Sequence, residues 1–180
     1  MKKSGKPLVI AIGGVSGGGK TTIVTQLKQQ FGKAEALYFD SYDFEGPENV
    51  FQWIEDGANY DEWNLTPLIR DLKEVLLKRH DYIFLDFPFA YQHSQTSGII
   101  DLVVFIDTPL DIALIRRMNR EFRDSSAEEM LQYMESYATY GRRGYLEMLQ
   151  TIRPDSNVVI DGTLSISQIV EKIREQVNRL

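Results

Sequence analysis

Glycines, a lysine and two threonines near the start of the chain are spaced as a phosphate-binding loop requires. The pattern G-x-x-x-x-G-K-[ST] is satisfied in full, and the nucleotide-binding residues that it predicts are Gly14, Val15, Ser16, Gly17, Gly18, Gly19, Lys20, Thr21 and Thr22. The glycines accept positive φ angles and leave space for an anion, so that backbone N–H groups can turn toward it. Lys20 would neutralise the charge of the β- and γ-phosphates, and the Thr21 hydroxyl would bind Mg²⁺. The segment therefore predicts a site for ATP and Mg²⁺.

The residues on either side predict the strand and the helix that must hold such a loop. Leu8 to Ile12 is a short apolar run followed by glycine, which is typical of a strand buried on both faces of a parallel sheet. Residues 21–31 carry apolar side chains at helical spacing, and Gly32 is the expected stop. The N-terminus of this helix would direct unpaired N–H groups at the phosphate. This context disfavours the plain alternative, a glycine-rich turn with a solvated lysine.

The rest of the chain alternates between strand and helix patterns. Further strands are predicted at 36–39, 82–85, 102–106 and 158–160. One helix should begin with Thr66 as its N-cap, another should follow Asp107-Thr108-Pro109, and the last should open with a capping box of Ser165 and Gln168. The alternation predicts an α/β fold with about five parallel strands sandwiched by helices. We expect one domain over residues 1–180, with a helical lid at approximately 112–145.

Two aspartates stand at the predicted carboxyl ends of strands, where they would face the phosphate loop. Asp40 follows the strand at 36–39 and could orient an attacking hydroxyl in line with the γ-phosphate or lie beside Mg²⁺, with Asp43 as a second candidate. The alternative for Asp40 is a turn or helix cap. Asp86 closes the apolar strand Tyr-Ile-Phe-Leu-Asp and fits a carboxylate associated with Mg²⁺, although ordinary strand-end turns also use aspartate.

A basic cluster lies in the predicted lid. Arg117 and Arg120 are the candidates for a catalytic role, because positive charge can stabilise a transferring phosphoryl group. The alternative is a solvated basic face that pairs with Glu121 or Asp124.

Aromatic and acidic residues gather between the second and third predicted strands. They suit a ring-bearing acceptor, because aromatic rings supply a stacking wall and carboxylates bind hydroxyl groups. The predicted substrate-binding residues are Tyr42, Asp43, Tyr60, Asp61, Trp63 and, after the third strand, Tyr91. Several of these aromatic residues must also serve as ordinary core. His93 could reach the same pocket or be purely structural.

Composition limits the partners and the location of the chain. A net charge of -6 argues against broad attraction to nucleic acid or acidic membranes. No window approaches the roughly 18 to 20 apolar residues of a membrane span, and Met1-Lys2-Lys3 with Leu8 to Ile12 is too short a match to a signal peptide. The absence of cysteine suits a reducing compartment. We expect a soluble, cytoplasmic protein whose partner is a small-molecule hydroxyl acceptor.

Five segments occur in the order seen in the uridine kinase and nicotinamide riboside kinase group. They are Gly-Gly-Val-Ser-Gly-Gly-Gly-Lys-Thr-Thr at 13–22, Phe-Asp-Ser-Tyr-Asp at 39–43, Asn-Tyr-Asp at 59–61, Arg-Arg-Met-Asn-Arg-Glu at 116–121 and Val-Ile-Asp-Gly at 159–162. The chain resembles this family over most of its length. The resemblance implies ATP-dependent phosphorylation of a nucleoside such as uridine or cytidine, or of a related riboside. It also implies that Asp40 accepts the proton of the hydroxyl and that Arg117 and Arg120 belong to a mobile lid.

The chain departs from the family pattern at three places. Asp86-Phe87-Pro88 stands where the family often has Glu-Gly, Asp124-Ser125-Ser126 replaces further arginines, and the stretch at 62–64 is shortened. The acceptor could therefore be another metabolite, such as pantothenate, a sugar acid or a nucleotide monophosphate. A regulatory module that hydrolyses ATP slowly is the alternative from a different class. A GTPase switch is disfavoured, because the guanine-binding motif N-K-x-D is absent. The residues do not determine the acceptor, the preference for ATP over GTP or the oligomeric state.

Overall fold

The computed structural model describes residues 5–180 and is centred on a five-stranded parallel sheet in the order β2-β3-β1-β4-β5. The strands are β1 (Leu8–Gly13), β2 (Ala34–Tyr38), β3 (Tyr82–Asp86), β4 (Leu102–Asp107) and β5 (Val158–Asp161). The three inner strands are apolar runs with side chains buried on both faces, as a parallel sheet covered by helices requires. The predicted α/β fold with about five parallel strands is confirmed.

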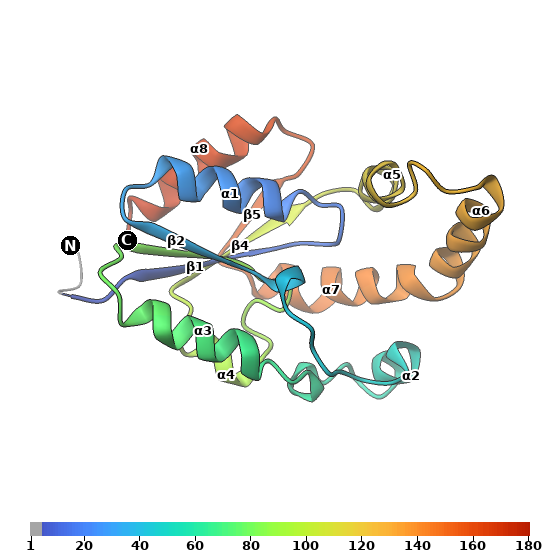
Figure 1. Cartoon of the computed structure of the whole chain (residues 1–180), viewed down its shortest axis with the longest axis horizontal. Helices are drawn as coiled ribbons and strands as arrows, with labels where there is room; N and C mark the ends of the chain where they lie inside the picture. Colours follow the sequence, from blue (N-terminus) through green and yellow to red (C-terminus); the bar gives the residue numbers. More distant parts are fainter. Residues whose placement is uncertain (1–4) are drawn as a thin grey trace.

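Helices cover both faces of the sheet (Figure 1). On one face lie α1 (Lys20–Gln30) and α8 (Ile166–Val177), and on the other lie α3 (Thr66–Leu76), α4 (Ser94–Ser97) and the C-terminal part of α7 (Arg142–Asp155). Each face has its own hydrophobic cluster, because alternate residues of a strand point to opposite sides. Ile10 and Ile12 of β1 pack with the α1 and α8 side, whereas Val9 and Ala11 pack with the α3 side.

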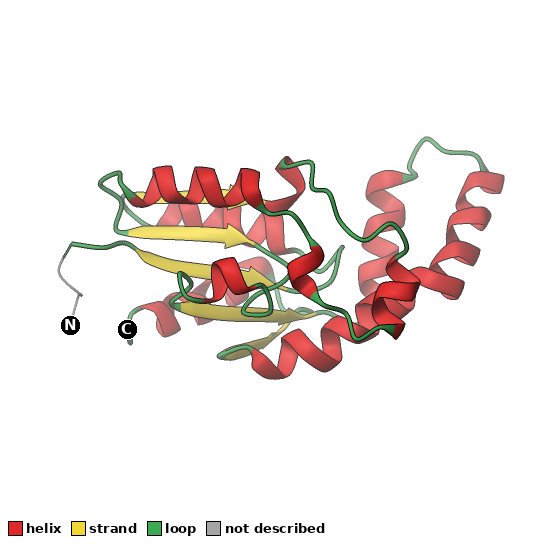
Figure 2. Ribbon diagram, turned by 90° about the horizontal axis from the view of Figure 1, so that it is seen from below, coloured by secondary structure: helices red, strands yellow, loops and turns green. Residues whose placement is uncertain are grey.

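A helical arm projects beyond the carboxyl edge of the sheet, toward which the strand arrows point in Figure 2. We use this term for α5 (Leu110–Glu121), α6 (Ala127–Ser136), the π-helical turn η3 (Tyr137–Gly141) and α7. Ser126 and Glu129 form a reciprocal capping box that starts α6. The chain then continues through the π turn into α7 without leaving helical backbone angles. The segment between β2 and α3 approaches this arm and contains η1 (Phe39–Ser41), α2 (Val50–Glu55) and η2 (Tyr60–Glu62).

Several expected boundaries differ from the structure. Strand β2 ends at Tyr38, so that Phe39 lies in a 3-10 turn instead of the strand, and Asp40 follows it in the same turn. Helix α1 ends at Gln30, and Lys33, not Gly32, takes the left-handed φ of 54°. Thr66 is the first residue of α3 and not its N-cap, because the Asn64 side chain accepts hydrogen bonds from the N–H and the hydroxyl of Thr66. The predicted capping box of Ser165 and Gln168 is confirmed.

The start of the chain carries two further observations. The residues compared with a signal peptide, Met1-Lys2-Lys3, lie outside the described residues. Among residues 5–180, none of the helices is both long enough and apolar enough to cross a membrane.

Candidate active site

The glycine-rich segment forms the turn from β1 to α1 at the carboxyl edge of the sheet. Gly14, Gly17 and Gly19 have φ angles of 143°, 81° and 97°, which disfavour other residues. A Cβ atom on Gly14 would lie 2.9 Å from the Ile106 carbonyl oxygen, and one on Gly17 would lie 2.2 Å from that of Ala113. The loop is therefore pressed against both β4 and α5. Helix α1 begins with no side-chain cap at Gly19, which leaves its first N–H groups available to an anion.

Three side chains meet beside this loop. The Thr21 hydroxyl donates a hydrogen bond to the Asp86 carboxylate at 2.6 Å, and the Lys20 ammonium donates to the Val15 carbonyl at 3.2 Å. Asp86 is only 2% exposed, because it ends an inner strand whose neighbours are Ile12 of β1 and Tyr38 of β2. A carboxylate and a hydroxyl on adjacent elements fit Mg²⁺, which prefers oxygen ligands and takes the remaining ones from water and phosphate. Among residues 5–180, no group of three or more acidic, histidine or cysteine side chains could hold a metal by itself.

The electrostatics of this group are set by burial and by mutual attraction. Burial raises the pKa of Asp86, and the nearby Lys20 charge and the Thr21 hydrogen bond offset part of this effect. Burial lowers the pKa of Lys20, whereas the charges of Asp86 and Asp40 act to raise it. Each group therefore stabilises the charged form of the other, and a bound phosphate would favour protonated Lys20 further.

Asp40 lies one turn beyond β2, in η1, on the same edge of the sheet. Its carboxylate is exposed and close enough for its charge to raise the pKa of both Lys20 and Asp86. No side-chain cap is present at the start of η1, and Asp40 makes no side-chain hydrogen bond within the described part of the chain. The alternative of a capping role for Asp40 thus has no support in the contacts. Asp43 is exposed as well.

The two arginines predicted for a lid, Arg117 and Arg120, occupy different environments. The Arg117 side chain is 13% exposed, and its guanidinium carbon lies 5.2 Å from the Tyr133 ring centroid and 5.4 Å from that of Tyr145. Arg117 also donates a hydrogen bond to the Tyr145 hydroxyl. Arg120 is exposed and forms an ion pair with Glu121 at 2.6 Å. Both guanidinium charges lower the pKa of Lys20, so both lie near the phosphate loop.

The expected acceptor residues are held by neighbouring elements. The Tyr42 hydroxyl donates to Asp71 of α3 at 3.1 Å, and burial together with this bond raises the pKa of Tyr42 to about 12. Tyr60 is buried and its hydroxyl lies 3.3 Å from that of Thr151 in α7. Trp63 is half-buried against Phe89, and its indole N–H is buried without a hydrogen-bond partner in residues 5–180. Trp63 thus presents an unused donor.

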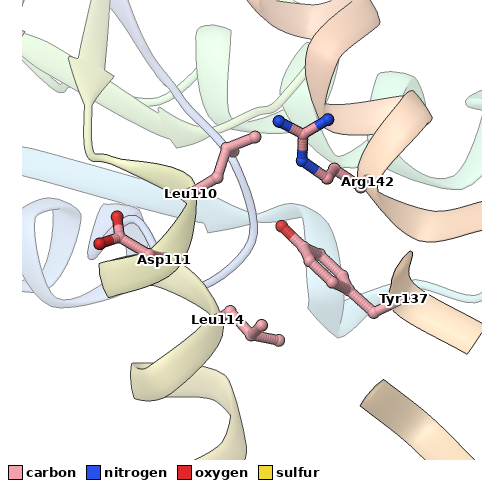
Figure 3. Close-up of a pocket in the computed structure, with 5 residues that line it drawn as sticks. All are labelled: Leu110, Asp111, Leu114, Tyr137 and Arg142. Atoms are coloured by element: carbon pink, nitrogen blue, oxygen red, sulfur yellow. The ribbon is translucent and has the colours of Figure 1, made fainter. Parts of the chain in front are cut away.

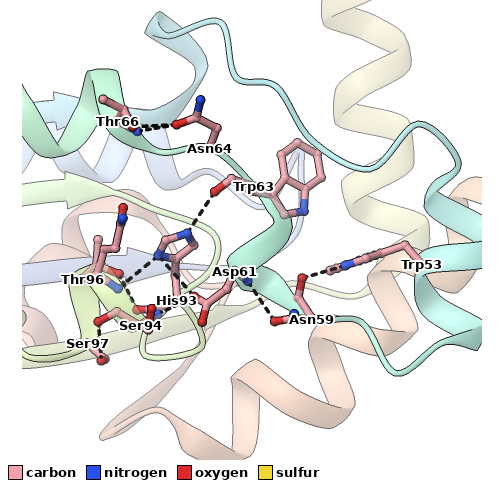
Figure 4. Close-up of polar contacts among 11 residues, drawn as sticks. Trp53, Asn59, Asp61, Trp63, Asn64, Thr66, His93, Ser94, Thr96 and Ser97 are labelled. Carbon is pink, nitrogen blue, oxygen red and sulfur yellow. Dashed lines mark hydrogen bonds and ion pairs between the residues drawn. The ribbon is translucent and has the colours of Figure 1, made fainter.

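Asp61 and His93 belong to a polar cluster at the start of α4 (Figure 4). Asp61 accepts a hydrogen bond from the Ser94 N–H at 2.7 Å, which lowers the pKa of Asp61, and lies 3.6 Å from His93. His93 is 2% exposed and its ring contacts the Trp63 carbonyl at 3.0 Å and the Gln95 N–H at 3.3 Å. A cavity of about 270 Å³ adjoins these residues. His93 is therefore the N-cap of α4, and it connects this helix to the backbone of Trp63.

Tyr91 lies elsewhere. Its hydroxyl donates to the Asn157 side chain at 2.7 Å, and the same oxygen of Asn157 accepts from the N–H of Val103. Val103 is near the start of β4, whereas the phosphate loop packs on Ile106 near the end of this strand. The Tyr91 hydroxyl is therefore engaged near the start of β4, and a role of Tyr91 in the acceptor site stays a prediction.

A second cavity, of about 440 Å³, lies between α5 and the π turn (Figure 3). The hydroxyl of Tyr137 points into it from the arm, and the Tyr137 ring lies 6.0 Å from that of Tyr145. Its lining residues are Leu110, Asp111, Leu114, Tyr137 and Arg142.

The sequence and the fold of the chain are similar to those of known kinases. The chain is 22% identical to the uridine kinase of Halalkalibacterium halodurans, over 94% of each protein. It superposes on a deoxyadenosine kinase from M. mycoides with a TM-score of 0.58 and 20% identity, covering 96% of this chain and 100% of that one. A gluconokinase from Sinorhizobium meliloti gives a TM-score of 0.53 and 19% identity, covering 92% and 88%. The fold is that of the P-loop kinases. No family model matches the chain.

Two residues of this P-loop kinase fold contact the phosphate loop without having been predicted. Thr108 is buried, and its hydroxyl donates to the Gly18 carbonyl at 3.1 Å; a Cβ atom on Gly162 would lie 1.9 Å from the same hydroxyl. The position of Thr108 directly after β4, at the same edge of the sheet as the loop, could have indicated this contact. Tyr145 contacts Ser16 and Arg117, but no local pattern marks it, because it follows Arg117 by 28 residues.

Proposed function

We propose that the chain is an ATP-dependent kinase that phosphorylates a hydroxyl group of a small metabolite, with a nucleoside or related riboside as the first candidate acceptor. The observation that carries this proposal is the meeting of the phosphate loop, the Thr21–Asp86 pair and the unengaged Asp40 carboxylate at one edge of the sheet. The similarity to uridine kinases over nearly the whole chain supports it.

Each part of this site would have a separate task. The backbone N–H groups of residues 14–22 and Lys20 would hold the phosphates of ATP, and Thr21 with Asp86 would hold Mg²⁺. When bound, Mg²⁺ would offset the charge that develops on the phosphate oxygens. Asp40 would accept a hydrogen bond from the acceptor hydroxyl and take up its proton, which aligns the oxygen with the γ-phosphate. We assign these roles on position and charge.

The helical arm would act as the lid. Arg117 and Arg120 project toward the loop from α5, so their positive charge would stabilise the transferring phosphoryl group. Closure of the arm over the nucleotide would exclude water and so limit ATP hydrolysis without an acceptor. We propose that residues 1–180 form one kinase domain.

The acceptor would bind between the sheet edge and the arm. Tyr42 and Trp63 supply aromatic surface there, and the buried Tyr60 belongs to the core against which they pack. The unpaired Trp63 N–H would donate to an acceptor oxygen of the ligand. Asp43 is exposed and available for hydroxyl groups, whereas Asp61 is already engaged with Ser94. A planar base with carbonyl oxygens and a sugar with hydroxyl groups match these contacts. The gluconokinase of the same fold makes a sugar acid the second candidate.

The proposal is tested by coupled measurement of ADP release with ATP and Mg²⁺ against a panel of nucleosides, nicotinamide riboside, pantothenate and sugar acids. We expect one acceptor to stimulate ADP release in the wild type, and Asp40→Ala to reduce this stimulation about 10²- to 10⁴-fold. Glu175→Ala is the control, because it removes an exposed carboxylate of α8, far from the site. A flat panel with the same slow hydrolysis in wild type and Asp40→Ala would instead indicate a regulatory module.

A further inference from the structure

The hydroxyl of Tyr145 connects the arm to the phosphate loop. Tyr145 belongs to α7, and its hydroxyl accepts a hydrogen bond from the Arg117 guanidinium. The Ser16 side chain of the phosphate loop lies near this hydroxyl and acts to lower the pKa of Tyr145. Burial is the main cause that raises the pKa of Tyr145, so the hydroxyl stays neutral and keeps its proton. One atom thus joins an arginine of α5 to a loop residue that adjoins the expected phosphates.

Arg117 is enclosed more tightly than a solvated lid arginine would be. The rings of Tyr133 and Tyr145 both contact its guanidinium group, each at a distance suited to a cation–π interaction. Its aliphatic stem packs on the loop, since a Cβ atom on Gly17 would lie 2.9 Å from Arg117 Cγ. Its Nε–H is buried without a partner in residues 5–180, and Glu121 approaches no closer than 4.0 Å. The group is fixed in place and still has an unused donor.

The π turn places both tyrosines of this clamp on one side of the arm. Tyr145 follows Tyr133 by twelve positions, which would separate them by about 120° around an unbroken α-helix of roughly 3.6 residues per turn. The π turn Tyr137–Gly141 lies between them where the chain changes direction from α6 to α7 (Figure 1), and both rings contact Arg117. Such turns occur frequently at functional sites. The geometry of the arm therefore depends on η3 for the contact of both rings with Arg117.

We propose that Tyr145 is a positioning residue that holds Arg117 over the phosphate loop before the nucleotide binds. The proposal rests on the kinase function proposed above and extends it to a residue that does not touch the substrate. Fixing a long side chain in advance removes the entropy that would otherwise be lost in the transition state, so that the effect falls on phosphoryl transfer and not on nucleotide binding. The hydroxyl of Tyr145, and not its ring alone, sets the orientation of the Arg117 guanidinium.

The test compares Tyr145→Phe, which keeps the ring and loses the hydroxyl, with the control Tyr140→Phe at an exposed tyrosine of the π turn. We expect Tyr145→Phe to lower kcat about 10-fold and change KM for ATP less than about twofold, because only the orientation of Arg117 is lost. In an Arg117→Ala background, the same substitution should have no further effect, since a residue that acts through Arg117 cannot act without it. Equal, additive losses in both backgrounds would overturn the proposal.

A second measurement keeps the inference separate from the proposed activity. Affinity for ADP with aluminium fluoride and Mg²⁺, which mimics the transferring phosphoryl group, can be measured without an acceptor. Tyr145→Phe should weaken this complex about 10-fold while leaving the affinity for ADP alone unchanged. If wild type shows no acceptor-dependent turnover but this difference is present, the proposed function fails and the positioning role stands. If both affinities fall together, or neither changes, the positioning role is refuted.

Discussion

Gly17 offers a direct test of how closely the phosphate loop packs on the arm. Replacement by alanine would place a Cβ atom 2.2 Å from the Ala113 carbonyl oxygen at a φ of 81°. The left-handed conformation alone costs an alanine about 1–2 kcal/mol, and overpacking against backbone adds about 1–3 kcal/mol. Alanine also lowers the conformational entropy of the unfolded chain, which offsets about 0.4–1 kcal/mol of this cost. We therefore expect Gly17→Ala to lower the free energy of unfolding by about 1–5 kcal/mol.

Two other glycines separate the causes. Gly57 has a φ of 99° but nothing within 4 Å of a Cβ atom, so Gly57→Ala should cost about 1 kcal/mol from the backbone conformation alone. Gly32 has neither a positive φ nor a neighbour, and Gly32→Ala should leave stability unchanged or raise it by up to about 1 kcal/mol. Urea unfolding gives all three values, and ATP affinity should fall in the Gly17 variant only. A Gly17 variant no less stable than the Gly57 variant would refute the close contact.

Two further substitutions test the charges and the polar cluster of the site. Burial raises the pKa of Asp86, so its ionisation lowers the free energy of unfolding at any pH above about 4, the pKa of aspartate in the unfolded chain. In urea unfolding, Asp86→Asn should therefore be more stable than wild type at pH 7, and the difference should vanish toward about pH 4. The same variant should lose Mg²⁺-dependent nucleotide binding. A lower stability at pH 7 would contradict this assignment. His93→Ala should lower the free energy of unfolding by about 2–4 kcal/mol, because the Trp63 carbonyl and the Gln95 N–H lose a buried partner. The same variant should leave KM for ATP unchanged, because none of these three residues belongs to the phosphate loop; an altered KM for ATP would contradict this.

Local patterns in the sequence predict the sheet and the phosphate loop well. The three inner strands are short apolar runs, and the loop motif fixes its own glycine positions because few other backbones can surround an anion. The carboxyl ends of parallel strands share one edge of a sheet, so the sequence alone indicates that Asp86 lies near the phosphate loop and Thr21. These features depend on residues close together in the chain or on the rules of parallel pairing.

Long-range side-chain contacts could not be predicted in the same way. The Tyr91 hydroxyl bonds to Asn157, which is 66 positions away, and nothing near Tyr91 signals this partner. Asp61 is predicted to bind substrate, and the hydrogen bond that its carboxylate accepts from the Ser94 N–H spans 33 positions, so that local sequence does not indicate it. The orientation of Tyr145 depends on a π turn, which hydrophobic periodicity does not reveal.

Helix α7 is the element through which the parts of the site are joined. Tyr145 contacts the phosphate loop through Ser16, and two residues earlier Arg143 lies over the Phe51 ring at 4.6 Å and pairs with Glu55 at 2.9 Å. These two contacts lie on α2, within the segment that carries the expected acceptor residues. A displacement of α7 would therefore disturb the phosphate loop and the acceptor segment together, because the same turn of helix holds both. If the arm is the lid of the proposed kinase, its closure and the recognition of the acceptor would be linked through these packed side chains.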